Sequence, residues 1–234
     1  ISNTWSYRSS IIFCASIHKK KGIDLSEEEK KEMLIFRQNI KVNTIILDKF
    51  INYIKLIDLY QKKFNLIGKN TRPKIWTRHI LDSAQIINYL PREQLKESIL
   101  DVGSGAGFPG IVLSILGRKD LILCDKNEKK TNFLKVVAND CKLKIRVIKT
   151  RIDGFKEENI KVIISRAFAP LKTLFYNVKH IINPETILII HKGKKYFEEI
   201  EEAYKVFDFD FKCYKSVSDP SGKIIKIQNV KIKC

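Results

Sequence analysis

Hydrophobic and polar residues follow two different patterns along this chain of 234 residues, and the first pattern is helical. From Leu25 to Leu59, apolar side chains recur at three- and four-residue spacing, as on a helix that buries one face. Ser26 followed by Glu29 predicts a capping box at its start. A further helix is predicted from "RHILDS" (78–83) to the residue before Pro91, because proline interrupts a helix. The first part of the chain is therefore expected to be helical.

From residue 98 onward, short apolar runs alternate with amphipathic segments. Strands are predicted at 98–102, 121–125, 144–150, 161–165 and 186–192, and helices at 110–117, 128–142, 171–182 and 195–207. Such alternation is typical of a doubly wound, parallel sheet. The last two strand-like runs flank "DPSG" (219–222), whose residues favour a chain reversal. We therefore predict an α/β fold with a mostly parallel sheet ending in an antiparallel hairpin. This is the Rossmann-like architecture of class I S-adenosylmethionine-dependent methyltransferases.

The chain divides by pattern into an extension at 1–23, a helical N-terminal extension at 24–97 and a core at 98–234. Residues 1–23 contain five serines and no acidic residue, a composition that fits a targeting leader for an organelle. A disordered extension, or residues upstream of the natural start, would have the same composition. No apolar run approaches the roughly 18 residues of a membrane span, so no membrane partner is predicted.

Charge is the strongest signal in the composition, with a net charge of +18. Both halves are basic, which favours a polyanionic partner such as nucleic acid, although the lysine-heavy composition that an AT-rich genome encodes would give the same balance. Residues 61–78 carry six basic side chains and no acid, with Phe64 and Trp76 among them. Such a loop can supply phosphate contacts and stacking faces for RNA. The alternative is a solvated connector.

The cysteines add one constraint. Five are spread along the chain with no C-x-x-C pair, so neither a metal site nor a disulfide framework is predicted. This distribution is typical of a reducing compartment.

Glycines follow the first predicted strand in "ILDVGSGAGFPG" (99–110), where Phe108 takes the place of the third glycine of a dinucleotide fingerprint. Glycines such as Gly103 and Gly105 let the backbone approach a ligand closely. Asp101 can attract the ammonium group of S-adenosylmethionine, directly or through water. Asp125 ends the next strand, 22 residues beyond Gly103, and can accept hydrogen bonds from ribose hydroxyls. We therefore predict S-adenosyl-L-methionine as the cofactor. The alternatives for the glycine stretch alone are an ordinary tight turn between strand and helix, and a dinucleotide site.

Motifs that the sequence lacks narrow the choice of the atom that accepts the methyl group. Methylation of a cytosine C5 needs a cysteine nucleophile, and none lies near the ends of the third and fourth strands. Methylation of exocyclic amines commonly uses an N-P-P-Y-type loop after the fourth strand, where this chain has "ISRAFAP" (164–170). Guanine N7 carries a lone pair and no proton, so its methylation needs alignment and exclusion of water but no catalytic base. No catalytic residue is therefore predicted.

Several ordered motifs resemble the bacterial glucose-inhibited division protein B family, the guanine-N7 methyltransferases of small-subunit (16S) ribosomal RNA. They are "FNLIG" (64–68), "RHILDS" (78–83), "DVGSGAGFPGIVLSI" (101–115), "DKNEKKTNFL" (125–134), "TRIDGF" (150–155), "ISRAFAPL" (164–171) and "HKG" (191–193). The resemblance covers about residues 45–230. It implies an enzyme, with small-subunit ribosomal RNA or the ribosomal subunit as its partner. We expect a monomer in the cytoplasm, or in an organelle matrix if residues 1–23 are a leader.

The resemblance also implies site residues. Cofactor positions carry over to Gly103, Phe108, Asp125, the pair Ile152–Asp153, and Arg166, to which we add Asp101 and Gly105. Phe108 would line the pocket, and Ile152 with Asp153 would hold the adenine. The family more often has Asp-Ser where this chain has Asp125–Lys126, and Val-Glu or Ala-Glu at the later pair, so Asp153 is one methylene shorter than the usual glutamate. Arg166 could instead be a surface residue of a loop.

Candidate RNA contacts come from the basic residues. They are Lys62, Lys63, Lys69, Arg72, Arg78, His79 and Lys192. His79 could equally be a satisfied polar residue at a helix start, and Lys192 could be solvated. Two other functions stay open: a methyltransferase acting on another RNA, a protein or a small molecule, and a non-catalytic RNA-binding protein that keeps a relic pocket. Cofactor binding and acceptor tests on RNA separate these functions.

Overall fold

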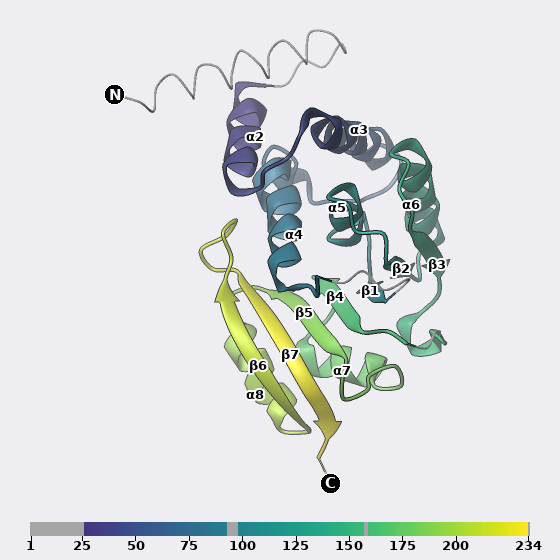
Figure 1. The fold of residues 1–234 in the computed structure, drawn as a ribbon, viewed down its shortest axis with the longest axis vertical. Coiled ribbons are helices and arrows are strands. Elements are labelled where there is room, and N and C mark those ends of the chain that lie inside the picture. Colours follow the sequence, from purple (N-terminus) through teal and green to yellow (C-terminus); the bar gives the residue numbers. More distant parts are fainter. Residues whose placement is uncertain (1–25, 93–97, 157–158, 234) are drawn as a thin grey trace.

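The computed structural model describes residues 26–92, 98–156 and 159–233, so the predicted extension 1–23 lies outside the described residues. Its centre is a seven-stranded sheet in the order β3-β2-β1-β4-β5-β7-β6 (Figure 1). The strands are β1 (Ile99–Val102), β2 (Leu121–Asp125), β3 (Arg146–Lys149), β4 (Val162–Arg166), β5 (Ile187–Lys192), β6 (Phe207–Lys215) and β7 (Lys223–Ile232). The first five pair in parallel and β7 is antiparallel to both neighbours. The predicted fold class is confirmed.

Helices cover both faces of the sheet, as Figure 1 shows. They are α5 (Gly110–Ile115), α6 (Glu128–Asp140), α7 (Leu171–Val178) and α8 (Tyr196–Tyr204), with a 3-10 turn η4 (Ile152–Gly154). Side chains alternate along β1: Ile99 points into the core shared with α5 and α6, and Leu100 points into the core shared with α7 and α8. Because both faces are buried, the parallel strands are nearly continuous apolar runs.

The N-terminal region is helical, but it consists of several pieces. They are α2 (Glu27–Asn39), α3 (Thr44–Gln61), η1 (Lys69–Thr71), η2 (Trp76–Leu81), α4 (Asp82–Ala84) and η3 (Gln85–Tyr89). The predicted capping box of Ser26 and Glu29 is confirmed. The helical pattern predicted for 25–59 is confirmed and consists of two helices, because Ile40 is extended and Asn43 caps a new helix through the Ile46 amide. The predicted end before Pro91 is confirmed at Leu90.

The N-terminal helices share one hydrophobic core with α5, α6 and the sheet. Phe36, Phe50 and Trp76 form a buried aromatic cluster. Trp76 is fully buried, so the prediction that it offers RNA a stacking face is wrong. The Tyr53 hydroxyl donates to the Ala106 carbonyl at 2.6 Å, which fixes α3 against the glycine loop.

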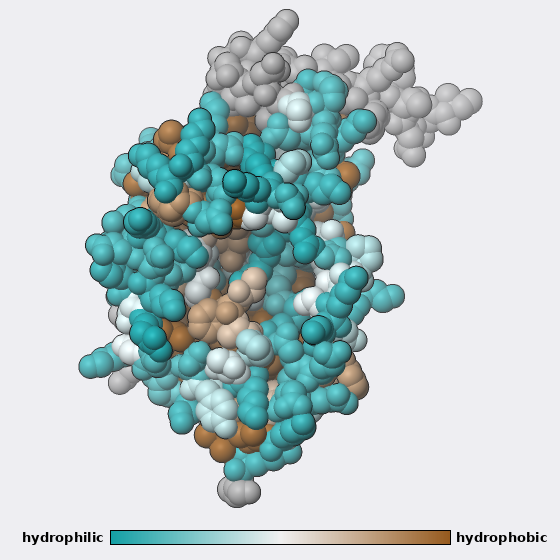
Figure 2. Space-filling model, turned by 180° about the vertical axis from the view of Figure 1, so that it is seen from behind, coloured by the Kyte–Doolittle hydropathy of each residue, from teal (hydrophilic) through white to brown (hydrophobic). Residues whose placement is uncertain are grey.

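The β6–β7 turn docks onto the end of the N-terminal region. Gln85 accepts from the Val217 amide at 2.9 Å, and Ser218 donates to an Asp82 carboxylate oxygen at 2.6 Å. Arg78 and Asp219 form an ion pair across the same contact. The hairpin and the N-terminal helices therefore meet at the carboxyl ends of β4 and β5. Figure 2 shows the opposite side of the molecule, on which hydrophilic residues surround a hollow with paler and brown residues inside it. No helix within the described ranges is long and apolar enough to cross a membrane.

Candidate active site

The loop after β1 has a backbone that requires glycine. Gly103, Gly105 and Gly107 have φ of +70°, +57° and +102°, in the left-handed region that disfavours side chains. A Cβ on Gly107 would lie 2.4 Å from an Ile111 carbon, and one on Gly103 would lie 2.4 Å from the Phe168 ring. The loop therefore forms a tight cradle at the carboxyl edge of the sheet, where open α/β folds bind ligands.

Asp125 links the ends of the first two strands. One of its carboxylate oxygens accepts from the Gly105 amide at 2.9 Å, and the other accepts from the Asn127 amide at 2.8 Å. These bonds leave each oxygen a further lone pair, so the carboxylate can still accept from two hydroxyls. The sequence therefore predicted the position of Asp125 correctly, on the rule that parallel strands bring their ends to one edge.

A cavity of about 400 Å³ opens beside these groups, and we call it the glycine-loop pocket. Its walls include Gly103, Asp125, Asn127, Ile152, Asp153 and Phe168. Ile152 is buried, whereas Asp153 is half-exposed and pairs with Arg151 at 3.0 Å. The pocket brings together four of the predicted cofactor residues, and its mixture of an apolar wall and two carboxylates fits an adenosine. Gly103 borders the pocket with its backbone, and the Phe168 ring lies where a side chain of Gly103 would be.

Two predicted cofactor residues lie beneath the loop instead. Asp101 is fully buried and accepts from the Gly110 amide at 2.9 Å; burial raises its pKa to about 7. Phe108 is also buried, with its ring against Tyr53, His79 and the Arg166 guanidinium. Neither residue belongs to the walls of the glycine-loop pocket. Both residues support the loop from behind, and the roles predicted for Phe108 as a pocket wall and for Asp101 as an ammonium partner, directly or through water, stay predictions.

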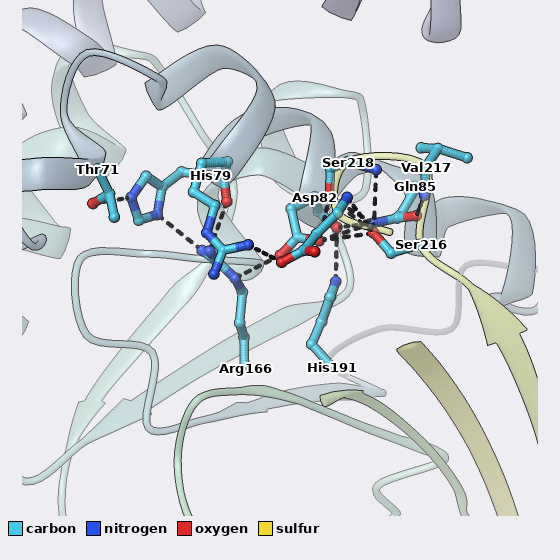
Figure 3. A network of polar contacts seen from close by, with 11 residues as sticks. Thr71, His79, Asp82, Gln85, Arg166, His191, Ser216, Val217 and Ser218 are labelled. Atoms are coloured by element: carbon cyan, nitrogen blue, oxygen red, sulfur yellow. Dashed lines mark hydrogen bonds and ion pairs between the residues drawn. The ribbon is translucent and has the colours of Figure 1, made fainter. Parts of the chain in front are cut away.

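Arg166 is held by a polar network that joins three parts of the chain (Figure 3). Its guanidinium pairs with Asp82 at 2.8 Å and donates to the Arg78 carbonyl at 2.8 Å and to His79 Nδ1 at 3.1 Å. Arginine only donates, so His79 Nδ1 is the acceptor and Nε2 donates to Thr71 Oγ1 at 2.8 Å. Burial, followed by the charge of Arg166, lowers the pKa of His79 to about 3. His79 is therefore neutral, and both of its ring nitrogens are hydrogen-bonded. This agrees with the alternative interpretation of His79 as a satisfied polar residue.

A second cavity, of about 390 Å³, lies next to this network, and we call it the hairpin pocket. Its walls include Arg78, Asp82, Arg166, Phe168, Lys192 and Asp219. Arg166 therefore faces this pocket and not the predicted cofactor pocket. The two cavities share Ala167 and Phe168, which form the partition between them.

The predicted RNA contacts divide into exposed and paired residues. Lys62, Lys63 and Lys69 are exposed. Arg72 instead pairs with Asp58 and with Glu29, the latter at 2.8 Å. Lys192 is buried, pairs with Glu199 at 2.6 Å and donates to the Ala169 carbonyl at 2.7 Å. The structure thus does not support the predicted phosphate contacts of Arg72 and Lys192, because both charges are paired with carboxylates of the same chain.

Sequence reasoning assigned no role to Asp82, His191 or Phe168. Asp82 and Phe168 lie within the quoted motifs, but nothing in their local spacing distinguishes them. His191 donates to the Asp82 carbonyl at 2.7 Å from the end of β5, and burial lowers its pKa.

Comparison with known proteins decides the family. A family model described as rRNA small subunit methyltransferase G matches residues 46–225. The chain belongs to this family. The ribosomal RNA small subunit methyltransferase G of Rickettsia prowazekii (strain Madrid E) is 38% identical over 191 residues, covering 82% of this chain and 98% of the relative. That of Orientia tsutsugamushi (strain Ikeda) is 36% identical over 190 residues, covering 81% and 94%.

Solved structures agree on the fold. A ribosomal protein L11 methylase from Lactobacillus delbrueckii subsp. bulgaricus superposes with a TM-score of 0.52 at 18% identity, covering 63% of this chain and 76% of its own. The glycopeptide N-methyltransferase MtfA, complexed with S-adenosyl-L-methionine, gives a TM-score of 0.52 at 8% identity, covering 64% and 93%. The family confirms the predictions of a methyltransferase and of S-adenosyl-L-methionine as its methyl donor.

Replacing Asp125 with Ala is expected to weaken S-adenosylmethionine binding by about 1.5–3 kcal/mol, the range for hydrogen bonds to a charged group. Loss of the bonds to Gly105 and Asn127 adds to this effect, because the loop is then less firmly held. Calorimetry on the folded variant measures it, with Asp140→Ala, at the end of α6, as the control carboxylate. Unchanged affinity would remove Asp125 from the cofactor site.

Proposed function

We propose that the protein transfers a methyl group from S-adenosyl-L-methionine to N7 of a guanine in small-subunit (16S) ribosomal RNA. The observation that carries this proposal is the state of the carboxylates in the hairpin pocket. Asp82 pairs with Arg166, Glu199 with Lys192 and Asp219 with Arg78. The imidazole on that wall, His191, is buried, and burial lowers its pKa, which makes it a weaker base. An acceptor atom with a lone pair and no proton suits such a pocket.

In this proposal, the residues of the chain bind the cofactor and align its methyl group with the acceptor guanine. The cofactor supplies an electrophilic methyl group on its sulfonium. Asp125 would accept from the ribose hydroxyls, Ile152 and Asp153 would hold the adenine, and the Gly103 backbone would border the methionine part. Transfer is then favoured by alignment and by exclusion of water rather than by proton transfer. We further propose that the protein acts as a monomer in the cytoplasm or an organelle matrix.

Small ribosomal subunits that lack the modification provide the test. After incubation with the protein and S-adenosylmethionine, mass spectrometry of the nucleosides should show one new N7-methylguanosine. Borohydride and aniline should then cleave the RNA at one guanosine, because the fixed positive charge weakens the glycosidic bond. Methyl incorporation without cleavage would indicate another acceptor. Cofactor binding without incorporation into RNA, protein or small molecules would indicate a relic.

The exposed lysines predict how RNA binding depends on salt. We expect Lys62, Lys63 and Lys69 to contact phosphates, since none of their ammonium groups has a carboxylate partner among the salt bridges of the described residues. Replacing all three with Gln should reduce the slope of log affinity against log salt by about 2–3, or roughly 0.7–0.9 for each contact. Filter binding to small-subunit ribosomal RNA across a salt series measures the slope.

The matched control replaces Lys212, Lys215 and Lys231, three exposed lysines of the β6–β7 hairpin. Both triple variants lose the same charge, so a specific contact is seen as a difference between their slopes. Equal slopes would identify residues 61–78 as a solvated connector. Arg72→Gln is expected to affect thermal stability instead of the slope, because its guanidinium pairs with Asp58 and Glu29.

A further inference from the structure

The partition between the two pockets carries an exposed aromatic ring. Ala167 and Phe168 are the only residues common to the walls of both cavities as described. Phe168 is 36% exposed, although a side chain of this size is usually buried. One side of its ring lies against the Gly103 backbone, so closely that a Cβ there would be 2.4 Å from Cδ2. The ring thus rests on the glycine loop and also borders the hairpin pocket.

The loop that presents this ring is fixed at both ends. On one side, Arg166 is held by Asp82 and His79. On the other side, the Ala169 carbonyl accepts from Lys192 and the Leu171 amide donates to Glu199 at 2.9 Å. Between them, Ala167 has φ of +55°, a left-handed conformation that is costly for alanine. Strain of this kind persists only where the surroundings impose it, and it clusters at functional positions.

The hairpin pocket has the chemistry of a site for one nucleotide. Three cations of its walls, Arg78, Arg166 and Lys192, are paired with carboxylates. Lys223 is the wall cation that suits a phosphate at the rim. Enzymes that modify a base within folded nucleic acid must take it out of its stack and hold it between side chains. Aromatic rings bind such bases through their π-faces. Two aromatic side chains, Phe168 and His191, belong to the described walls of this cavity, and of these only Phe168 is exposed.

We propose that Phe168 is the stacking surface for the acceptor guanine, which enters the hairpin pocket with its N7 edge toward the glycine-loop pocket. This assignment rests on the proposed function. The methyl group would pass at the partition, because that is where the two cavities adjoin. Arg166, Lys192 and Glu199 act as positioning residues, which hold the loop so that the ring is ready before RNA binds.

The test compares four variants of the full chain: Phe168→Ala, Phe168→Leu, Phe168→Tyr and Phe168→Trp. Methylation of unmodified small ribosomal subunits is measured as kcat/KM and by single turnover, and cofactor affinity is measured by calorimetry. Phe197→Ala is the control, since Phe197 is 56% exposed on α8 and lies outside the walls of both pockets. Because Phe168 is partly exposed, its variants are expected to fold, which cofactor binding verifies.

A stacking role for Phe168 predicts a specific order of kcat/KM among the four variants. Phe168→Ala and Phe168→Leu should lose about five- to 150-fold in kcat/KM, the equivalent of one base–aromatic contact. Phe168→Tyr and Phe168→Trp should keep activity within a few-fold, and cofactor affinity should stay within about threefold in all four. The loss in Phe168→Leu separates stacking from simple filling of space, because leucine retains apolar volume.

Three results would overturn the proposal. Full activity of Phe168→Leu would show that only bulk is needed. A parallel loss of cofactor affinity would show that Phe168 acts by holding the cofactor and not the base, and higher activity of Phe168→Ala would show that the ring obstructs the pocket. Failure of the proposed function would be seen in the wild-type protein, which would then leave every guanine unmodified. In that case the stacking role of Phe168 would also be excluded.

Discussion

Replacing Asp82 with Ala is expected to lower the free energy of unfolding by about 3–5 kcal/mol, the effect of removing one partner of a buried ion pair. The carboxylate is the centre of the network in Figure 3: it pairs with Arg166 and accepts from Ser218 and from Gln85 at 3.0 Å. Without it, the Arg166 guanidinium would remain buried with no opposite charge. Denaturant unfolding at neutral pH measures the difference.

Two further variants separate this explanation from a general surface effect. Glu185→Ala removes the exposed partner of Lys161, and exposed pairs typically contribute only about 0.2–1 kcal/mol. The double variant Asp82→Ala/Arg166→Met should recover part of the lost stability, because no uncompensated charge remains. If Asp82→Ala costs no more than Glu185→Ala, the network does not hold the loop.

Replacing Asp101 with Asn should change how stability depends on pH. Burial raises the Asp101 pKa from 3.8 to about 7, so the folded protein keeps this proton at pH values where the unfolded chain has lost it. Its contribution to stability is therefore present at acid pH and is lost as the pH rises through 7. Between pH 5 and pH 8 the loss amounts to about 2–3 kcal/mol. Asn carries no charge and can still accept from the Gly110 amide.

The measurable quantity is the stability of Asp101→Asn minus that of the wild type at each pH. It should increase from pH 5 to pH 8. The difference is used because His79 acts in the opposite direction: its lowered pKa, about 3, makes stability rise with pH between about 3 and 6.5 in both proteins. Parallel curves would mean that Asp101 titrates normally and that its carboxylate is hydrated.

The strands of the sheet could be predicted because their burial on both faces is visible in short stretches of sequence. Strands buried on both faces require unbroken apolar runs such as "ILII" (187–190) at the start of β5, and such runs are visible in sequence. Gly103 and Asp125 were found for a similar reason, since the carboxyl ends of parallel strands share an edge. Predicted helices extended beyond the observed ones by a few residues, as for 195–207 against Tyr196–Tyr204, because the final turn gives way to β6 without a proline or glycine.

The partners of charged residues were not predictable. Arg72 appeared free because its partners, Asp58 and Glu29, are 14 and 43 residues away and come from two different helices. Lys192 appeared to end a strand in solvent, yet Glu199 reaches it from the next helix. Phe108 follows the glycines as a pocket residue would, but the ring packs inward against Tyr53 from α3. In each case tertiary packing, which leaves no periodic trace in sequence, decided the role.

The contact between the β6–β7 turn and Asp82 also sets an order of events during synthesis. Ser218 and Val217 are 136 and 132 residues from their partners Asp82 and Gln85. A nascent chain can fold its parallel strands as they emerge, but one wall of the hairpin pocket is missing until Asp219 and Lys223 have left the ribosome. If the hairpin pocket holds the acceptor as proposed, methyl transfer by an unfinished chain is disfavoured. Premature termination shortly before the hairpin would then leave a protein with the glycine-loop pocket and an incomplete hairpin pocket.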